Sequence, residues 1–160
     1  MSCSTGLPRV VFLGTPEFAV HILEAAVSVA NVVLVITQPD KPQGRGRGVA
    51  APPVKGAAMG LGIEVIQPEV VKGRRFAERI KAYEPDFMVT AAYGKVLGRS
   101  LLMTPTRDAL NVHASLLPRH RGAAPANWAI LEGDELAGVC IMRMVEALED
   151  RKSTRLNSSH

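Results

Sequence analysis

Residues 9–14 of this 160-residue chain are RVVFLG, an apolar and β-branched run that stops at a glycine. Residues 17–30, which follow, are rich in Ala, Leu and Val, and they carry Glu17 in the first turn, where a helix N-terminus favours negative charge. A strand leading into a helix is therefore predicted at the start of the chain. Further short apolar runs that predict strands occupy residues 31–37, 63–66, 86–91, 109–113 and 137–144.

The runs are apolar on both faces, which is typical of strands covered by helices on two sides. Residues 53–59 open with proline, which suits the first position of a helix, and residues 73–83 repeat apolar side chains at helical spacing. Another short helix is predicted after Pro125, around Trp128. Alternating strands and helices indicate an α/β fold with a mostly parallel sheet.

Composition excludes several classes of protein. Hydrophobic residues make up 47% of the chain, too many for a disordered or low-complexity segment. The net charge of +4 is a mild excess that does not by itself indicate a nucleic-acid binder. No apolar run is long enough to span a membrane, and the first apolar run reads as a buried strand rather than a signal peptide. Cys3 and Cys140 form no pattern, which favours a reducing compartment without a disulfide or thiolate metal site.

Two segments interrupt the alternation of strands and helices. Residues 38–53 contain four Pro, three Gly and three basic side chains, and they are too long for an ordinary strand-to-helix connection. Residues 115–125 are dense in Pro, Arg and Gly and come directly after a predicted strand. Because ligands of open α/β sheets bind at the carboxyl ends of strands, function is expected in these two loops.

Asn111 and His113 are the candidate catalytic pair. They alternate along the strand predicted at residues 109–113, so both side chains point to the same face. An amide can donate to a developing oxyanion, and an imidazole can move a proton near neutral pH, which together suit acyl transfer. No Ser or Cys nucleophile is obviously paired with them, which favours direct transfer over a covalent intermediate. A hydrogen-bonded pair at a sheet edge is the structural alternative.

Other kinds of site have less support. Gly14 is the only glycine in the turn after the first strand, and the glycine-rich residues 44–48 do not lie between that strand and its helix, so no phosphate loop is predicted. His21 is interpreted as an ordinary surface or core residue, and His120 as either a substrate contact or a solvated side chain. Without an HExxH or CxxC pattern, no metal site is expected.

Four segments, in order along the chain, resemble one enzyme family. They are GTPEFA at 14–19, QPDKPQGRG at 38–46, NVHASLLPR at 111–119 and RGAAP at 121–125. The Asn-x-His and Ser-Leu-Leu-Pro motifs are shared among folate-dependent formyltransferases. The other motifs, QPDKP…GRG and RGAAP, are more specific to methionyl-tRNA formyltransferases. The resemblance runs from about residue 9 to residue 148.

This resemblance implies a Rossmann-like formyltransferase domain. Its expected reaction is transfer of a formyl group from the co-substrate 10-formyltetrahydrofolate to the α-amino group of methionyl initiator tRNA, without a metal. Asn111 and His113 would stabilise the tetrahedral oxyanion and assist proton transfer to the departing folate nitrogen. The resemblance also implies a folate pocket lined by Ser115, Leu116, Leu117, Pro118, Tyr93 and Gly94. It further implies that the tRNA acceptor end is contacted by Lys41, Arg45 and Arg47. The alternative for the basic segment is a solvated, disordered loop when no tRNA is bound.

The end of the sequence departs from the family. The family's third catalytic residue is an aspartate in a Leu-Asp-Thr-Gly-Asp-like turn, and Glu149 stands at its position without the Thr-Gly that should follow. Residues 150–160 resemble no part of the family and match the conceptual translation of a common sequencing adapter, so we expect a non-native tail. Residues 1–149 would then be an incomplete N-terminal catalytic domain of a longer protein, and the 160-residue chain would have little or no formyltransferase activity.

Two other functions remain open at this stage. One is another folate-dependent formyltransferase or a formylfolate hydrolase, against which the basic residues 38–53 argue. The other is a non-catalytic module that binds tRNA or folate, which the missing aspartate favours and the intact Asn111 and His113 disfavour. The absence of a signal segment and the family's role predict the cytoplasm, and a monomer is expected for the full-length protein.

Overall fold

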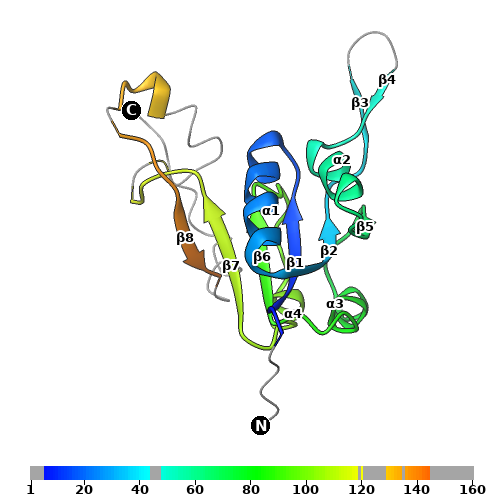
Figure 1. Cartoon of the computed structure of the whole chain (residues 1–160). Coiled ribbons are helices and arrows are strands. Elements are labelled where there is room, and N and C mark those ends of the chain that lie inside the picture. The colour runs from blue at the N-terminus through cyan, green and yellow to red at the C-terminus, as the bar shows by residue number, and fades with distance from the viewer. Residues whose placement is uncertain (1–5, 44–47, 119, 121–128, 135, 145–160) are drawn as a thin grey trace.

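The computed structural model describes residues 6–43, 48–118, 120, 129–134 and 136–144. These residues form a six-stranded sheet, a separate two-stranded hairpin, four labelled helices and a further short helical segment at residues 129–131 (Figure 1). The strands are β1 (Arg9–Gly14), β2 (Asn31–Ile36), β3 (Lys41–Gln43), β4 (Gly48–Ala50), β5 (Val65–Ile66), β6 (Phe87–Ala91), β7 (Asp108–His113) and β8 (Cys140–Arg143). The helices are α1 (Glu17–Val29), α2 (Pro53–Gly60), α3 (Arg74–Lys81) and α4 (Arg99–Leu102).

The large sheet has the strand order β5-β2-β1-β6-β7-β8. Every neighbouring pair is parallel except β7 and β8, which run antiparallel. The prediction of an α/β fold with a mostly parallel sheet is therefore confirmed. Parallel order also brings the carboxyl ends of β1, β2, β6 and β7 to one edge of the sheet, at the top of Figure 1.

The central strand β1 shows why the core has two layers. Val10 and Phe12 face the apolar cluster that includes side chains of α1 and α2. Val11 and Leu13 face the opposite cluster, which includes Ile80 of α3 and Leu101 of α4. Because successive strand residues point to opposite faces, an entirely apolar strand is stable only when helices cover both faces.

Several predicted boundaries shift in the structure. The strand expected over 63–66 covers only Val65–Ile66, and the one expected over 137–144 covers Cys140–Arg143. Residues 129–131 are helical, while the rest of the helix predicted around Trp128 lies outside the described residues. Helix α4 is an addition that the sequence did not predict. None of the described helices has the length and apolar character needed to cross a membrane.

The segment predicted as a long loop, residues 38–53, contains the hairpin of β3 and β4. Each strand has three residues, and Lys41 pairs with Ala50 at its base. The sequence did not predict this hairpin, because strands this short, with a proline in one of them, leave no alternating pattern.

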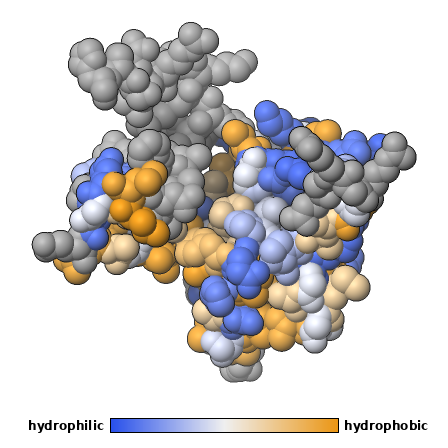
Figure 2. Space-filling view, turned by 90° about the horizontal axis from the view of Figure 1, so that it is seen from above, coloured by the Kyte–Doolittle hydropathy of each residue, from blue (hydrophilic) through white to orange (hydrophobic). Residues whose placement is uncertain are grey.

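Strand β8 lies at one edge of the described sheet. Its Ile141 side chain is 71% exposed, and the segment before it exposes Leu131 and Leu136. Hydrophobic residues are visible at the surface on this side of the molecule (Figure 2). An edge strand with exposed apolar side chains is a site at which chains can associate.

Candidate active site

The turn after β1 depends on a glycine. A Cβ atom on Gly14 would lie 2.7 Å from the Cβ of Ala19 and 2.8 Å from Cε1 of Phe12, closer than packed carbon atoms approach. Glycine therefore allows the first turn of α1 to pack directly onto the end of β1. The next residue, Thr15, donates its hydroxyl hydrogen to the main-chain oxygen of Tyr93 at 3.0 Å, which joins this turn to the one after β6.

Asn111 is held by a buried hydroxyl on the neighbouring strand. β6 and β7 are parallel with Thr90 opposite Asn111, and Thr90 is only 4% exposed. Thr90 Oγ1 donates to Asn111 Oδ1 at 2.8 Å. Because the carboxamide oxygen is engaged in this bond, the Nδ2 group of Asn111 is the part of the amide left to donate to a substrate.

His113 ends β7, two residues after Asn111, so the two side chains lie on the same face of the strand. Its Nδ1 atom is 2.8 Å from Oγ of Ser115, a residue that is 3% exposed. In the tautomer in which Nδ1–H donates to this hydroxyl, Nε2 carries the free lone pair that can accept a proton. The structure thus brings the two predicted catalytic residues together at the carboxyl end of β7.

The turn after β6 has an unusual backbone. Ala92 has φ 46° and Gly94 has φ 84°, both in the left-handed region, and such a conformation costs about 1–3 kcal/mol for a residue with a side chain. The Tyr93 carbonyl between them accepts hydrogen bonds from Thr15 and from Gln38 Nε2, the latter at 2.7 Å. These bonds hold a strained turn at the edge where ligands of such sheets bind.

Tyr93 and Gly94, both predicted to line the folate pocket, differ in their surroundings. The Tyr93 side chain packs into the core on the α3 and α4 side and is 4% exposed. Burial raises the pKa of Tyr93 to about 12, so its phenol remains protonated at neutral pH. Gly94 is exposed. A ligand at this turn would therefore meet its backbone rather than the phenol.

The predicted Ser115–Pro118 loop begins two residues after His113 and packs against the approach to β8. The main-chain N–H of Leu117 donates to Sγ of Cys140 at 3.4 Å, and Leu116 lies so close to Gly138 that a Cβ there would clash with it. Pro118 follows a cis peptide bond. Ser115 and Leu116 also line a cavity of about 480 Å³. This loop therefore connects the His113 contact to a space that a small group can enter.

The basic hairpin is anchored at its base. The Asp40 carboxylate accepts hydrogen bonds from Gln67 and from Lys55, whose Nζ is 2.7 Å away. These bonds, that from Gln67 first, hold the pKa of Asp40 below its ordinary value. Lys41, the described member of the predicted tRNA contacts, is exposed on β3 next to this anchor. The other predicted tRNA contacts, Arg45 and Arg47, lie outside the described part of the chain, as does the predicted catalytic residue Glu149.

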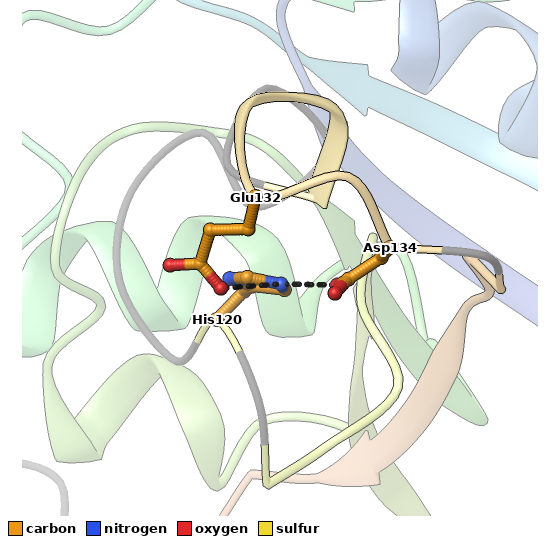
Figure 3. A group of neighbouring side chains, drawn as sticks. All are labelled: His120, Glu132 and Asp134. Carbon is orange, nitrogen blue, oxygen red and sulfur yellow. Dashed lines mark hydrogen bonds and ion pairs between the residues drawn. The ribbon is translucent and has the colours of Figure 1, made fainter.

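His120 forms a cluster that the sequence did not predict (Figure 3). Its Nε2 atom is 2.7 Å from Oδ2 of Asp134 and 3.9 Å from Oε2 of Glu132. The His120 and Asp134 side chains are only 8% and 7% exposed. His120 is therefore not the solvated side chain that one interpretation of the sequence expected. Three such ligand types could hold a cation, but the short Nε2–Oδ2 distance is that of a direct hydrogen bond. No spacing rule links residues 120 and 134, so the sequence held no signal for this pair.

Comparison with known proteins gives a consistent result. Residues 8–150 match the family described as formyl transferase. The methionyl-tRNA formyltransferase of Myxococcus xanthus (strain DK1622) is 53% identical over 142 residues, covering 89% of this chain and 46% of the relative. That of Listeria monocytogenes (serotype 4a, strain HCC23) is 50% identical over 143 residues, with the same coverage. The chain spans about half the length of the curated relatives that it matches.

Solved structures are similar in fold. Glycinamide ribonucleotide transformylase 1 from Symbiobacterium toebii has a TM-score of 0.65 at 20% identity, covering 91% of this chain and 69% of the other. Phosphoribosylglycinamide formyltransferase from Bacillus halodurans has a TM-score of 0.63 at 24% identity, covering 86% and 72%. At these identities the likeness is one of fold alone.

Proposed function

Because the chain belongs to the formyl transferase family, we propose that its protein transfers a formyl group from 10-formyltetrahydrofolate to the α-amino group of methionyl initiator tRNA. The observation that carries this proposal is the placement of Asn111 and His113 on one face at the carboxyl end of β7. Identities of 50–53% to methionyl-tRNA formyltransferases over 89% of the chain support this choice of acceptor.

The proposed reaction proceeds by direct attack. The methionyl amine attacks the formyl carbon, so a carbon–nitrogen bond forms and the formyl oxygen gains negative charge. Asn111 donates from Nδ2 to this oxyanion, because its Oδ1 is engaged by Thr90. The bond between the formyl carbon and folate nitrogen 10 then breaks, and the proton lost by the amine ends on that nitrogen.

His113 is the group that carries this proton. With Nδ1 hydrogen-bonded to Ser115, its Nε2 accepts the proton from the attacking amine and returns it to the departing nitrogen. No nucleophile from the protein enters the reaction, so one donor and one proton carrier are sufficient. In the family pattern an acid beside the histidine orients the ring, and we assign that position to Glu149.

The folate would bind against the turn after β6 and the loop after β7. Both lie at the carboxyl edge of the sheet beside Asn111 and His113. Gly94, Leu116 and Pro118 are all exposed, so a flat ring system can reach both segments. The residues present therefore fit the donor, which supplies an activated formyl group.

The hairpin of β3 and β4 would contact the acceptor end of the tRNA. It carries Lys41, Arg45 and Arg47 within seven residues, and its base is fixed by the ion pair of Asp40 and Lys55. Cations on a projecting arm bind phosphates without reading sequence, so they position the acceptor end rather than select it. We also propose that the protein acts in the cytoplasm as a monomer when full length.

A full-length chimera tests the proposal. Residues 8–148 replace the matching segment of the Myxococcus xanthus relative, and formyl transfer to charged initiator tRNA is measured. Asn111→Ala should lower kcat by about 10²–10³ and His113→Ala by about 10²–10⁴. His21→Ala, which changes an exposed histidine, is the matched control and should leave kcat unchanged. Full activity in either active-site variant would contradict the proposal.

A chimera extended to residue 149 tests the third position. Versions that carry glutamate or aspartate at position 149 differ by one methylene, and catalytic groups require placement to within about 0.5 Å. The aspartate version should be the faster enzyme. Equal kcat values for the two would refute the assignment of this position to a catalytic acid.

A further inference from the structure

The turn after β6 is held from outside its own strand. Its central carbonyl, that of Tyr93, accepts a hydrogen bond from Gln38 Nε2 at 2.7 Å and a second from Thr15 Oγ1 at 3.0 Å. Gln38 follows β2, and Thr15 follows β1. The conformation of the turn therefore depends on side chains that two other strands place at the same edge of the sheet.

Gln38 also fits the turn sterically. Gly94 has φ 84°, and a Cβ at this position would clash with the Gln38 amide, so the amide occupies space that any other residue at position 94 would fill. Ala92 on the other side of Tyr93 also has a left-handed φ, 46°. A left-handed conformation is strained at a residue with a side chain such as Ala92, so it persists only where the surroundings restrain it, and the Gln38 bond is the shorter of the two restraints on the neighbouring Tyr93 carbonyl.

Gln38 is itself fixed at its main chain. Its carbonyl oxygen accepts a hydrogen bond from Gln67 Nε2 at 2.9 Å, and the same Gln67 amide lies 2.5 Å from Oδ1 of Asp40. Asp40 in turn pairs with Lys55. These bonds hold the Gln38 main chain and the base of the β3–β4 hairpin, whereas the Gln38 side-chain amide makes the separate bond to the turn.

We propose that Gln38 is a positioning residue that holds the turn of residues 92–94 in the conformation that receives the folate formyl donor. The proposal rests on the function proposed above, because that function assigns the turn to the folate pocket. Gln38 acts through the Tyr93 carbonyl and touches no reacting atom. Its role differs from that of Gln67, whose side-chain amide bonds the Gln38 carbonyl and Asp40 at the hairpin base.

The first test measures the turn itself in the 160-residue chain. The amide order parameter of Gly94, from nitrogen-15 relaxation, should be near 0.85 in the unchanged protein and below about 0.6 in Gln38→Leu. Gln38→Glu is nearly isosteric and replaces the donor NH₂ with an acceptor oxygen, so it should lower the order parameter in the same way. This variant keeps the test available if Gln38→Leu fails to fold. Gln67→Leu removes the same kind of amide one step further away and should leave the order parameter unchanged.

The second test measures binding of 5-formyltetrahydrofolate, a stable folate, by calorimetry. Gln38→Leu and Gln38→Glu should weaken binding by about tenfold, a loss of about 1.4 kcal/mol, while Gln67→Leu stays within twofold at a similar thermal stability. A purely structural role for Gln38 would instead weaken binding in proportion to lost stability in all three variants.

The outcomes separate the two proposals. An unchanged Gly94 order parameter in both Gln38 variants overturns the positioning role, whatever the folate affinity. A lowered order parameter with undiminished folate binding also overturns it, because the turn would then not need to be held. A lowered order parameter in a chain that binds no folate at all supports the restraint and contradicts the assignment of the turn to a folate pocket.

Discussion

Replacement of Gly14 by alanine is a direct test of how the first turn is packed. The added Cβ would lie 2.7 Å from Ala19 Cβ and 2.8 Å from Phe12 Cε1, whereas ordinary carbon contacts begin near 3.5 Å. Both neighbours are fully buried, and Ala19 is fixed in the first turn of α1. Neither can move away by a simple rotation, so α1 must shift relative to β1.

The magnitude follows from the packing of the core. Inserting one carbon atom into a filled interior costs typically about 1–3 kcal/mol, so Gly14→Ala should lower the free energy of unfolding by that amount. Gly56→Ala is the matched control, because this glycine lies inside α2 and nothing lies within 4 Å of its would-be Cβ. Alanine in a helix interior is favoured over glycine by about 0.5–1 kcal/mol, so the control should be more stable than the unchanged protein.

Urea unfolding followed by circular dichroism measures both variants. Equal slopes of free energy against urea would show that the unfolded states are comparable, and the midpoints should then move in opposite directions. A Gly14→Ala variant at least as stable as the unchanged protein would refute the argument, because α1 would then not be in close contact with the end of β1.

Three further perturbations address other parts of the structure. The backbone hydrogen bond from Arg9 lowers the pKa of Asp86, so the ionised carboxylate stabilises the fold, and this stabilisation should be lost as the pH falls below about 4. In Asp86→Asn, the urea midpoint should therefore fall less steeply with decreasing pH in this range. Thr90→Val should lower kcat of the chimera roughly three- to tenfold at unchanged KM by freeing the Asn111 amide, while Thr90→Ser keeps the hydroxyl and the rate. Ile141→Lys on the exposed edge strand β8 should reduce self-association in sedimentation experiments. The control Val29→Lys, on the exposed face of α1, should not reduce it. Equal effects of the two substitutions would argue against association through β8.

The sequence was sufficient for the main architecture because the strands of a covered parallel sheet are apolar throughout. The run at residues 9–14 predicts β1 residue for residue, and the alternation of Asn111 with His113 places both on one face without any knowledge of the fold. Local pattern is enough in these cases because burial on both faces leaves a compositional signature.

The parts that sequence reasoning missed depend on contacts between distant residues. Gln38 reaches Tyr93 across 55 positions, and Thr90 meets Asn111 only through the register of two parallel strands. The pairing of His120 with Asp134 is likewise set by the path of the chain rather than by spacing. Such contacts have no periodicity, so they are visible only once the order of the strands is known.

The proposed function places formyl transfer to methionyl-tRNA at the carboxyl ends of β6 and β7. In the most direct measurement, the chimera of residues 8–148 is given labelled 10-formyltetrahydrofolate and one of two acceptors. The first acceptor is charged initiator tRNA, and the second is glycinamide ribonucleotide, which the solved structures of similar fold are named for. We expect label on the methionyl-tRNA, lost in Asn111→Ala, and none on the ribonucleotide. Label on the ribonucleotide alone, or transfer that persists without Asn111, would contradict it.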